Sequence, residues 1–195
     1  MRIFREFDAL PHFRHPAVTV GTFDGVHRGH RALLERLVAE ARALGGESVV
    51  LTFDPHPRVT LGRADDLQLL TTLNEKAALL GQSGVDAVVV IPFDRAFSAL
   101  SGAEFVERIL LGRIGAETLV AGYDHCFGHD RCDCETAVVG RMKVVRVAAC
   151  EVDGQRVSST AIRRLLAEGK QNEAEKLAGH LLNAGCRFEN RTQNR

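Results

Sequence analysis

Residues 21–30 concentrate the groups best suited to phosphate chemistry, in the order Gly-Thr-Phe-Asp-Gly-Val-His-Arg-Gly-His. The glycines allow the backbone to approach a ligand closely. His27 and His30 are three residues apart, so that one in a loop and the other in the first helical turn can face the same ligand. A helix N-terminus attracts anions, and an anion raises the pKa of a nearby histidine. The segment therefore predicts a phosphate site with two donors that can become cationic.

A second candidate phosphate site is the run Ser158-Ser159-Thr160, directly before an apolar helical face that begins at Ile162. One of the three hydroxyl residues caps the helix, and the others, with backbone N–H groups, can hold phosphate oxygens. Arg163 in the first turn can grip a leaving pyrophosphate with two hydrogen bonds. Each motif alone is more often a turn or a cap, but their occurrence in one chain favours a polyphosphate ligand.

Four arginines crowd these two helix starts: Arg28, Arg31, Arg163 and Arg164. Cations are stabilising at helix C-termini, and each one at an N-terminus costs roughly 0.3–1 kcal/mol unless an anion lies between the charge and the helix dipole. This placement predicts a polyphosphate that bridges the two helix starts.

Short apolar runs rich in Val and Ile alternate with segments of helical spacing, which predicts a doubly wound α/β fold with its active crevice at the carboxyl ends of the strands. The predicted strands are 17–20, 48–53, 87–91, 118–121 and 144–149. The predicted helices are 31–44, one that starts near a Thr72–Glu75 capping box and reaches 81–84, and 103–111, which ends at Gly112. Residues 128–140 leave little room for a crossover helix and predict a loop or a reduced helix.

The bulk composition is that of a soluble globular protein, with 195 residues, 45% hydrophobic residues and a formal net charge of zero. It predicts one domain over residues 1–182 with a polar tail over 183–195. A neutral balance gives no electrostatic reason to expect a nucleic acid or a membrane surface as partner. The five cysteines and the lack of an N-terminal signal pattern predict a cytoplasmic protein with free thiols. The oligomeric state is not predictable from this composition.

The string GTFDGVHRGH resembles the HxGH signature of the nucleotidyltransferase superfamily, and more narrowly the FMN adenylyltransferase (FAD synthetase) module of bacterial bifunctional riboflavin kinase/FAD synthetase. Further matches are TFDPHP at 52–57, Leu73–Lys76 with L-x-E-K, Gly-Val-Asp at 84–86 and the ISSTxIR pattern at 157–163. The resemblance implies a Rossmann-like sheet that joins ATP to FMN and gives FAD and pyrophosphate.

The resemblance also assigns roles by position. It implies that His27, His30 and Arg163 are catalytic. The ATP-binding residues would be Gly21, Phe23, His27, Gly29, His30, Asp124, Ser158, Ser159, Thr160 and Arg163. The FMN-binding residues would be Asp54, Pro55, His56 and Pro57. Mg²⁺ would be bound mainly through the ATP phosphates, because the sequence contains no dedicated carboxylate cage.

Residues 122–128 depart from the family pattern, since His125 and Cys126 stand where an aromatic and usually a basic residue are found. The segment after Gly128 is shorter than in relatives, and no riboflavin kinase module follows within the 195 residues, so riboflavin phosphorylation is not expected.

Three alternatives remain open from the sequence. The acceptor could be another phosphorylated molecule, such as pantetheine phosphate, nicotinamide mononucleotide or, with CTP, glycerol phosphate. The chain could be a degenerate relative that binds nucleotide or flavin without turnover. A metal site could form from His125, Cys126, His129, Cys132 and Cys134, although a thiol-rich surface loop is favoured because C-x₅-C-x-C is not a usual zinc spacing.

Overall fold

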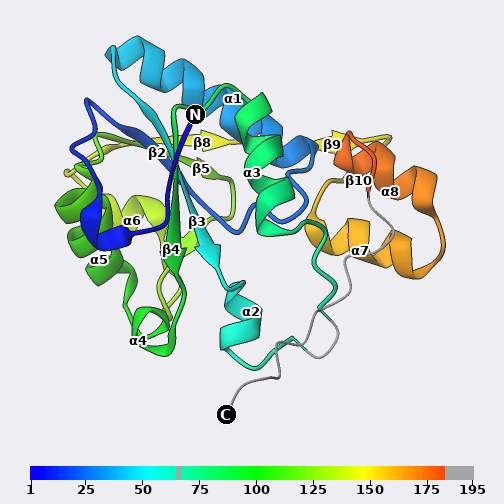
Figure 1. Cartoon of the computed structure of the whole chain (residues 1–195). Helices are drawn as coiled ribbons and strands as arrows, with labels where there is room; N and C mark the ends of the chain where they lie inside the picture. The colour runs from blue at the N-terminus through cyan, green and yellow to red at the C-terminus, as the bar shows by residue number, and fades with distance from the viewer. Residues whose placement is uncertain (65–66, 183–195) are drawn as a thin grey trace.

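The computed structural model describes residues 1–64 and 67–182, so the tail predicted over 183–195 lies outside the described residues. A parallel sheet of six strands forms the centre of the molecule, in the order β1-β4-β3-β2-β5-β8 (Figure 1). Its strands are β1 (Arg2–Phe4), β2 (Ala17–Val20), β3 (Ser48–Asp54), β4 (Ala87–Pro92), β5 (Thr118–Gly122) and β8 (Lys143–Val147). The doubly wound parallel fold expected from the sequence is confirmed.

Alternate strand residues point to opposite faces of the sheet and bury two separate apolar layers. Val50 and its neighbours pack against α1 (Arg28–Leu44) and α3 (Leu73–Gln82) on one face. Val49 and Leu51 pack on the other face, against α5 (Gly102–Phe105) and the π-helical segment Val106–Ile114. Strands buried on both faces need near-continuous apolar sequence, which is what these segments contain.

The predicted helix ends are partly confirmed. Thr72 caps α3 in a capping box with Glu75, as expected. The helix expected to stop at Gly112 continues to Ile114, and Gly115, with a left-handed φ of 71°, ends it. Gly112 therefore lies inside the helix, where an added Cβ would approach the carbonyl oxygen of Glu107 to 3.0 Å.

The stretch expected to be a loop or a reduced helix contains the short hairpin β6 (Cys126–Phe127) and β7 (Cys132–Asp133), then the five-residue helix α6 (Cys134–Val138). Cys134 and Val138 are buried in the apolar layer beneath the sheet, so the reduced helix still covers this part of it.

A second group of elements lies beside the carboxyl edge of the sheet (Figure 1). It contains the hairpin β9 (Glu151–Val152) and β10 (Gln155–Arg156), then α7 (Ser159–Ala167) and α8 (Gln171–Ala178). Its helices share their own apolar cluster, which includes Ile162, Leu165 and Leu177. The connections after β3 and β4 carry two shorter helices, α2 (Pro57–Thr60) and α4 (Arg95–Ser98).

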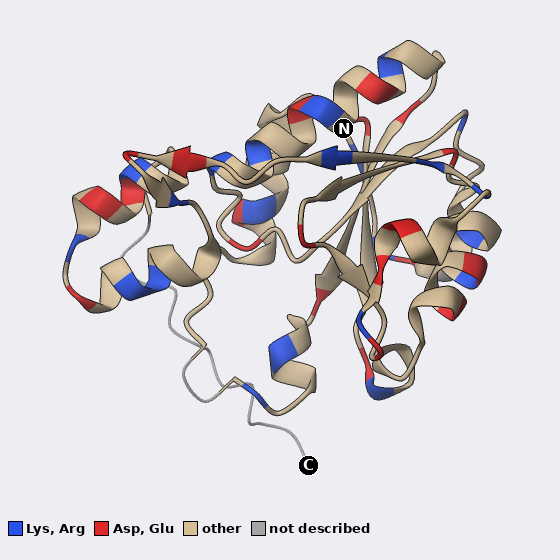
Figure 2. Ribbon diagram, turned by 180° about the vertical axis from the view of Figure 1, so that it is seen from behind, with Lys and Arg blue, Asp and Glu red and all other residues tan. Residues whose placement is uncertain are grey.

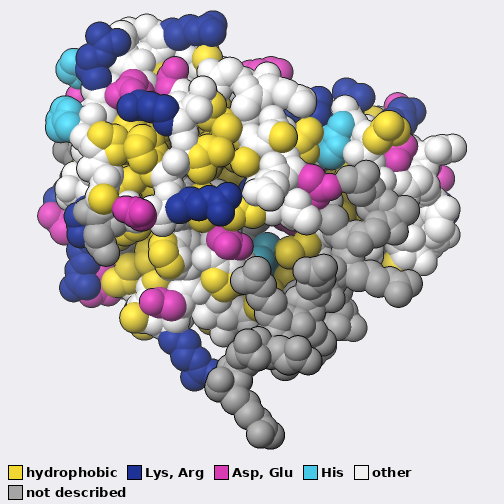
Figure 3. Space-filling model, in the orientation of Figure 1, with side chains coloured by type: hydrophobic (Ala, Val, Ile, Leu, Met, Phe, Trp, Pro, Cys, Tyr) yellow, Lys and Arg dark blue, Asp and Glu magenta, His cyan; other side chains and the backbone are white. Residues whose placement is uncertain are grey.

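Charges of both signs are interspersed along the helices and strands (Figure 2). The space-filling view shows the same mixture, with hydrophobic side chains between acidic and basic ones (Figure 3). Within residues 1–64 and 67–182, no helix is both long enough and apolar enough to cross a membrane.

Candidate active site

A cavity of about 520 Å³ lies at the carboxyl ends of β2 and β5. These neighbouring strands mark the point where the strand order reverses, because β3 and β4 lie on one side of β2 while β5 and β8 lie on the other. Open α/β sheets bind ligands at such a point. We call this space the switch-point cavity. Nine of the predicted site residues line it: Gly21, Phe23, His27, Gly29, His30, Asp124, Ser158, Ser159 and Thr160.

The loop after β2 places two histidine rings together at the start of α1. His27 is the N-cap, and its Nδ1 accepts a hydrogen bond of 3.3 Å from the backbone N–H of His30. The two rings are stacked with centroids 3.6 Å apart and planes 12° apart. A Cβ on Gly29 would approach the His27 ring to 3.3 Å, so this position favours glycine.

The same loop holds two larger residues in an unusual conformation. Phe23 and Val26 have positive φ angles of 48° and 32°, which β-branched and bulky residues rarely adopt. Both side chains are buried, at 1% and 0% exposure, and their packing compensates for the strained backbone. The burial of these two side chains therefore fixes the conformation of the loop.

Both histidines are neutral at pH 7 in this structure. Burial lowers the pKa of His27 to about 4, against the opposing effect of Asp24. Burial also lowers the pKa of His30 well below its usual value, and the charges of His27 and Lys76 act in the same direction. The Nδ1 of His30 is buried and has no hydrogen-bond partner among the described residues. An anion bound here would raise both pKa values, because it favours the protonated ring.

The start of α7 meets the same cavity. Ser158 is the N-cap and accepts a hydrogen bond of 3.1 Å from Ala161 N. The hydroxyl of Ser159 donates to the carbonyl of Asp24 at 2.9 Å, which ties α7 to the loop after β2. Thr160 is exposed on the wall of the cavity. The two helix starts that the sequence singled out thus converge on one space.

Arg163 is not among the residues that line the switch-point cavity. Its guanidinium pairs with the buried carboxylate of Asp24, and its Nε donates to the carbonyl of Gln68 at 2.7 Å. The Asp24 carboxylate also accepts from the backbone N–H groups of Leu70 and Thr71, at 3.0 and 3.1 Å. Arg163 therefore supports the loop from behind in this structure.

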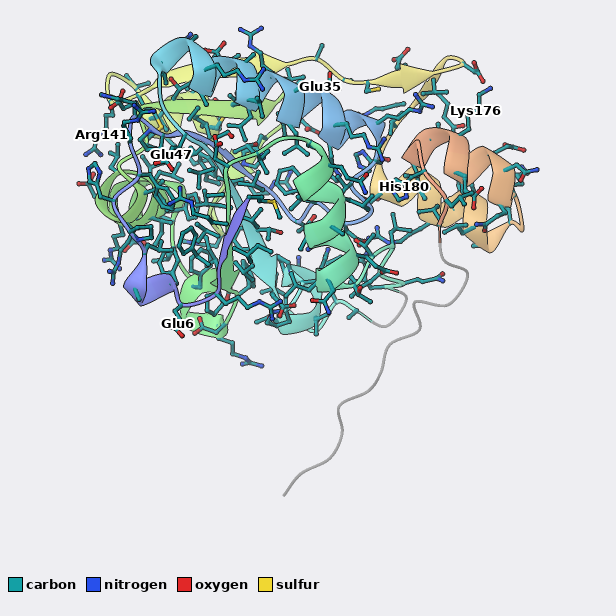
Figure 4. All side chains as sticks on the ribbon, turned by 45° about the horizontal axis from the view of Figure 1, so that its top comes forward. Glu6, Glu35, Glu47, Arg141, Lys176 and His180 are labelled. Atoms are coloured by element: carbon teal, nitrogen blue, oxygen red, sulfur yellow. The ribbon has the colours of Figure 1, made fainter. Side chains whose placement is uncertain are left out.

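The two arginines of α1 pair with backbone carbonyls, whereas the sequence predicted a polyphosphate as their partner. Arg28 donates to the carbonyl of Lys176 at 2.8 Å, and Arg31 donates to the carbonyl of Gly179 at 3.3 Å. These carbonyls lie at the C-terminal end of α8, where cations are stabilising. Figure 4 shows Lys176 and His180 on this part of the molecule, and His180 Nε2 lies 2.7 Å from the carbonyl of Gly25. The inference that these arginines require a bound anion is wrong.

The fourth arginine does not support that inference either. Arg164 is mostly exposed and lies 4.0 Å from Glu168, one turn further along α7. It is therefore paired within its own helix.

Lys76 is a charged residue that sequence reasoning overlooked, although it stands in the L-x-E-K segment. Its side chain is buried at 6% exposure, and its ammonium donates to the Thr52 hydroxyl at a long 3.4 Å. Thr52 in turn donates to the carbonyl of Thr22 in the cavity wall. Burial lowers the pKa of Lys76, while Asp24 and Asp54 oppose this shift. A cation with so little compensation is typical of functional sites.

Asp124 lies in the cavity wall but is paired in this structure. Its carboxylate is 3.0 Å from the guanidinium of Arg156, which also lies over the ring of Tyr123 at 4.4 Å from the centroid. The Arg146 guanidinium donates to the carbonyls of Gly122 and Tyr123 at 3.1 Å each and so fixes the chain after β5.

A second cavity, of about 400 Å³, adjoins the first, and we call it the aromatic cavity. Neighbouring phenylalanine rings in its wall have centroids 5.0 to 5.9 Å apart. Val20, Phe53 and His125 line both cavities, so the two spaces meet there. The aromatic residues in its lining are Phe53, Phe93, Phe97, Phe105 and Phe127.

The four residues expected to bind flavin, Asp54 to Pro57, follow Phe53 but do not line either cavity. His56 caps α2 by accepting a hydrogen bond of 3.1 Å from Arg58 N. Burial lowers the pKa of His56 to about 4, and the charges of Asp24 and Arg163 also act on it. The segment therefore lies at the edge of the site.

The thiol-rich segment forms part of the aromatic cavity wall through His125, Cys126 and His129. Across the described ranges, no three His, Cys, Asp or Glu side chains are grouped closely enough to hold a metal ion. Cys126, Cys132 and Cys134 are free thiols, and burial raises the pKa of Cys134 to about 11.

The parallel sheet, the paired histidines at its reversal point and the hydroxyl-rich helix start define a protein of the nucleotidyltransferase class. Residues 11–161 match the family model described as FAD synthetase. The chain belongs to the FAD synthetase family.

Curated relatives agree with this assignment. The chain is 40% identical to a bifunctional riboflavin kinase/FMN adenylyltransferase from Pseudomonas fluorescens, over 87% of this chain and 56% of that protein. It is 37% identical to a putative protein of the same name from Geobacillus thermodenitrificans, over 83% of this chain and 88% of that protein. The chain thus spans about half the length of the first of these relatives and most of the second.

A solved structure has the same fold. The crystal structure of a macrolide-efflux protein from Streptococcus pneumoniae superposes with a TM-score of 0.81 and 27% identity, over 91% of this chain and 59% of that one.

Proposed function

We propose that this chain transfers AMP from ATP to FMN and releases pyrophosphate, so that FAD is formed. The observation that carries the proposal is the meeting of two unlike cavities at the end of the sheet. The switch-point cavity offers two helix starts and stacked histidines, which suit a triphosphate. The aromatic cavity offers phenylalanine faces, which suit the flat isoalloxazine ring. The names of the bifunctional relatives support the same pair of substrates.

In the proposed reaction, a phosphate oxygen of FMN attacks the α-phosphorus of ATP as the bond to pyrophosphate breaks. His27 and His30 hold the reacting phosphates. The Nδ1 of His27 accepts from the backbone N–H of His30, so His27 donates to phosphate through Nε2–H, which stabilises the charge that develops in transfer. The backbone N–H groups and hydroxyls at Ser158–Thr160 hold the outer phosphates. Catalysis then rests on positioning and electrostatics, as in other phosphoryl transfers.

The roles of three predicted groups follow from their contacts. Arg163 supports the site through Asp24, and a direct contact with pyrophosphate would require it to leave that partner. Asp124 would likewise exchange Arg156 for the nucleotide. Residues 54–57 would border the flavin at its edge, next to Phe53.

Mg²⁺ belongs to the proposal as a charge carried in by ATP. The ion would be held mainly by oxygens of the triphosphate and water, because Mg²⁺ usually keeps several waters and is bound through substrate phosphates rather than by an all-protein cage. When bound, it neutralises phosphate charge. A cytoplasmic protein without a nucleic-acid partner fits the balanced charge of the chain and remains part of the proposal.

The test is to incubate the purified chain with ATP, Mg²⁺ and FMN and to separate the flavins by chromatography. FAD formation that is lost in His27→Ala supports the proposal. Parallel reactions with pantetheine phosphate, nicotinamide mononucleotide and, with CTP, glycerol phosphate test the other acceptors. Turnover of one of these instead of FMN would overturn the choice of acceptor, and ATP or flavin binding without any turnover would identify a degenerate relative.

A further inference from the structure

The junction between the two cavities contains one polar side chain among the described residues that line both. Val20 and Phe53 contribute apolar surface there, while His125 contributes an imidazole. Substrates that occupy the two cavities must meet at this junction in order to react. A polar group at this place is therefore adjacent to the transfer step.

Two contacts with neighbouring residues of its own loop hold His125 in place. Its backbone N–H donates to the carbonyl of Gly122 at 3.2 Å. Its ring packs edge-to-face on Phe127, with centroids 4.9 Å apart and planes 80° apart. These contacts position the ring in the common wall of the two cavities.

The ring of His125 nevertheless has unused hydrogen-bonding capacity. Its Nε2 is buried and has no partner among the residues that the structure describes. Burial lowers the pKa of His125 to about 4, and the charge of Arg146 acts in the same direction, so the ring is neutral at pH 7. A neutral imidazole retains one N–H donor and one acceptor. A buried polar atom without a partner is unfavourable, so a ligand that pairs with this ring gains affinity.

The nearby acidic groups do not oppose an anion at the junction, because each already has a cation. Asp124 is paired with Arg156. Asp133 is paired with Arg146, which also contacts Glu135 at 3.0 Å. A phosphate that enters beside His125 therefore meets a neutral N–H donor and compensated carboxylates.

We propose that His125 is a positioning residue that donates a hydrogen bond to the phosphate of the acceptor. This inference rests on the proposed function, because it takes the flavin ring to fill the aromatic cavity and the ATP phosphates to lie at the starts of α1 and α7. The phosphate of FMN must then pass through the junction. His125 holds it there for attack on ATP.

The test compares two flavins that differ only in this phosphate. The affinities of FMN and riboflavin are measured by quenching of flavin fluorescence in the wild-type chain, His125→Phe and His125→Gln. Phenylalanine keeps a ring against Phe127 and removes the donor, whereas glutamine keeps an N–H donor. We expect His125→Phe to weaken FMN binding on the order of tenfold, the usual size for a hydrogen bond to a charged group, and to leave riboflavin binding unchanged.

We expect His125→Gln to retain most of the preference for FMN over riboflavin. If His125→Phe loses equal affinity for FMN and riboflavin, or loses affinity for neither, the proposal is overturned. Circular dichroism verifies folding, and His125→Ala provides the same comparison if His125→Phe does not fold.

The binding assay also separates this inference from the proposed function. If the wild-type chain forms no FAD but His125→Phe still loses its preference for FMN over riboflavin, the adenylyltransfer proposal fails and the role of His125 stands. If the wild type forms FAD, the variant should raise KM for FMN and leave KM for ATP unchanged. An unchanged KM for FMN would count against the role of His125 alone.

Discussion

The guanidinium of Arg163 is paired with the carboxylate of Asp24, whose side chain is 2% exposed, behind the wall of the switch-point cavity. The same carboxylate accepts hydrogen bonds from the backbone of Leu70 and Thr71. One buried ion pair thus joins α7, the loop after β2 and the segment before α3. Its role is to hold these three segments together.

Removing either partner should destabilise the fold. Asp24→Asn and Arg163→Met should each lower the free energy of unfolding by about 3–5 kcal/mol, because each leaves a buried charge unpaired. The double variant should lose less free energy of unfolding than the two single variants lose together. Urea unfolding measures all three. Arg164→Met is the matched control, because Arg164 is exposed and should have little effect.

The unfolding measurements on Arg163→Met also distinguish a structural role of Arg163 from a direct contact with pyrophosphate. A variant Arg163→Met with wild-type stability and weakened ATP binding would contradict the structural role. It would place this arginine on the pyrophosphate instead.

His27 should make the protein less stable in mild acid. Its pKa is about 4 in the folded protein and about 6.5 in the unfolded chain, so its stabilising contribution is complete above pH 6.5 and is lost as the pH falls toward 4. Between pH 7 and pH 5 the free energy of unfolding of the wild type should fall by about 2 kcal/mol more than that of His27→Asn. The asparagine retains a capping side chain and does not titrate in this range. Urea unfolding at pH 7, 6 and 5 measures the difference. If the free energy of unfolding changes with pH in the same way in both proteins, the lowered pKa of His27 is refuted.

The start of α7 allows capping to be separated from ligand binding. Ser158→Ala should lower stability by about 1 kcal/mol, because Ser158 is the N-cap. Thr160→Ala should leave stability unchanged, since Thr160 is exposed, and should weaken ATP binding through loss of a hydroxyl in the cavity wall. Thermal unfolding and isothermal titration with ATP measure the two effects. Unchanged ATP affinity in Thr160→Ala would exclude a contact between this hydroxyl and the nucleotide.

Lys76 should matter for activity more than for stability. Lys76→Met removes a buried ammonium whose hydrogen bond to Thr52 is long, so the free energy of unfolding should stay the same or rise. The rate of FAD formation should fall by at least about tenfold if the charge acts on bound phosphate. Lys76→Arg tests whether charge alone suffices. A large loss of stability in Lys76→Met would show that the lysine has a structural role.

The aromatic cavity should determine flavin affinity separately from nucleotide affinity. Phe97→Ala should raise KM for FMN by about tenfold or more, because the ring contacts Phe53, Phe93 and Phe105 in the cavity wall, and should leave KM for ATP unchanged. Phe4→Ala is the control, since Phe4 packs on Phe13 outside the cavity. Equal changes in KM for FMN in Phe97→Ala and Phe4→Ala would point to general destabilisation of the fold.

Local sequence patterns predicted the elements that depend only on neighbouring residues. The β2 apolar run, the Thr72 capping box and the position of His27 before α1 all depend on neighbours within one helical turn or one strand. β1 was missed because three residues at the edge of a sheet show no clear period. α8 was missed although the spacing of Ala174, Leu177 and Ala178 indicates a helical face.

The site was less predictable where it depends on partners far along the chain. Arg28 and Arg31 have the charge that suits phosphate, but their partners are carbonyls 148 residues away. The aromatic cavity combines phenylalanines from β3, α5, β6 and the segment after β4, and no local pattern links them. The importance of Lys76 arises from burial, which the sequence of α3 alone does not reveal.

The attachment of α8 to α1 gives the loop after β2 a remote support. Arg28, Arg31 and the carbonyl of Gly25 all contact the stretch from Lys176 to His180. The family match ends at residue 161, before this stretch begins. A fragment cut at that point would keep the histidine loop but lose Arg163 and the contacts from α8 that support this loop, so the smallest working unit of this protein extends beyond the region that the family model matches.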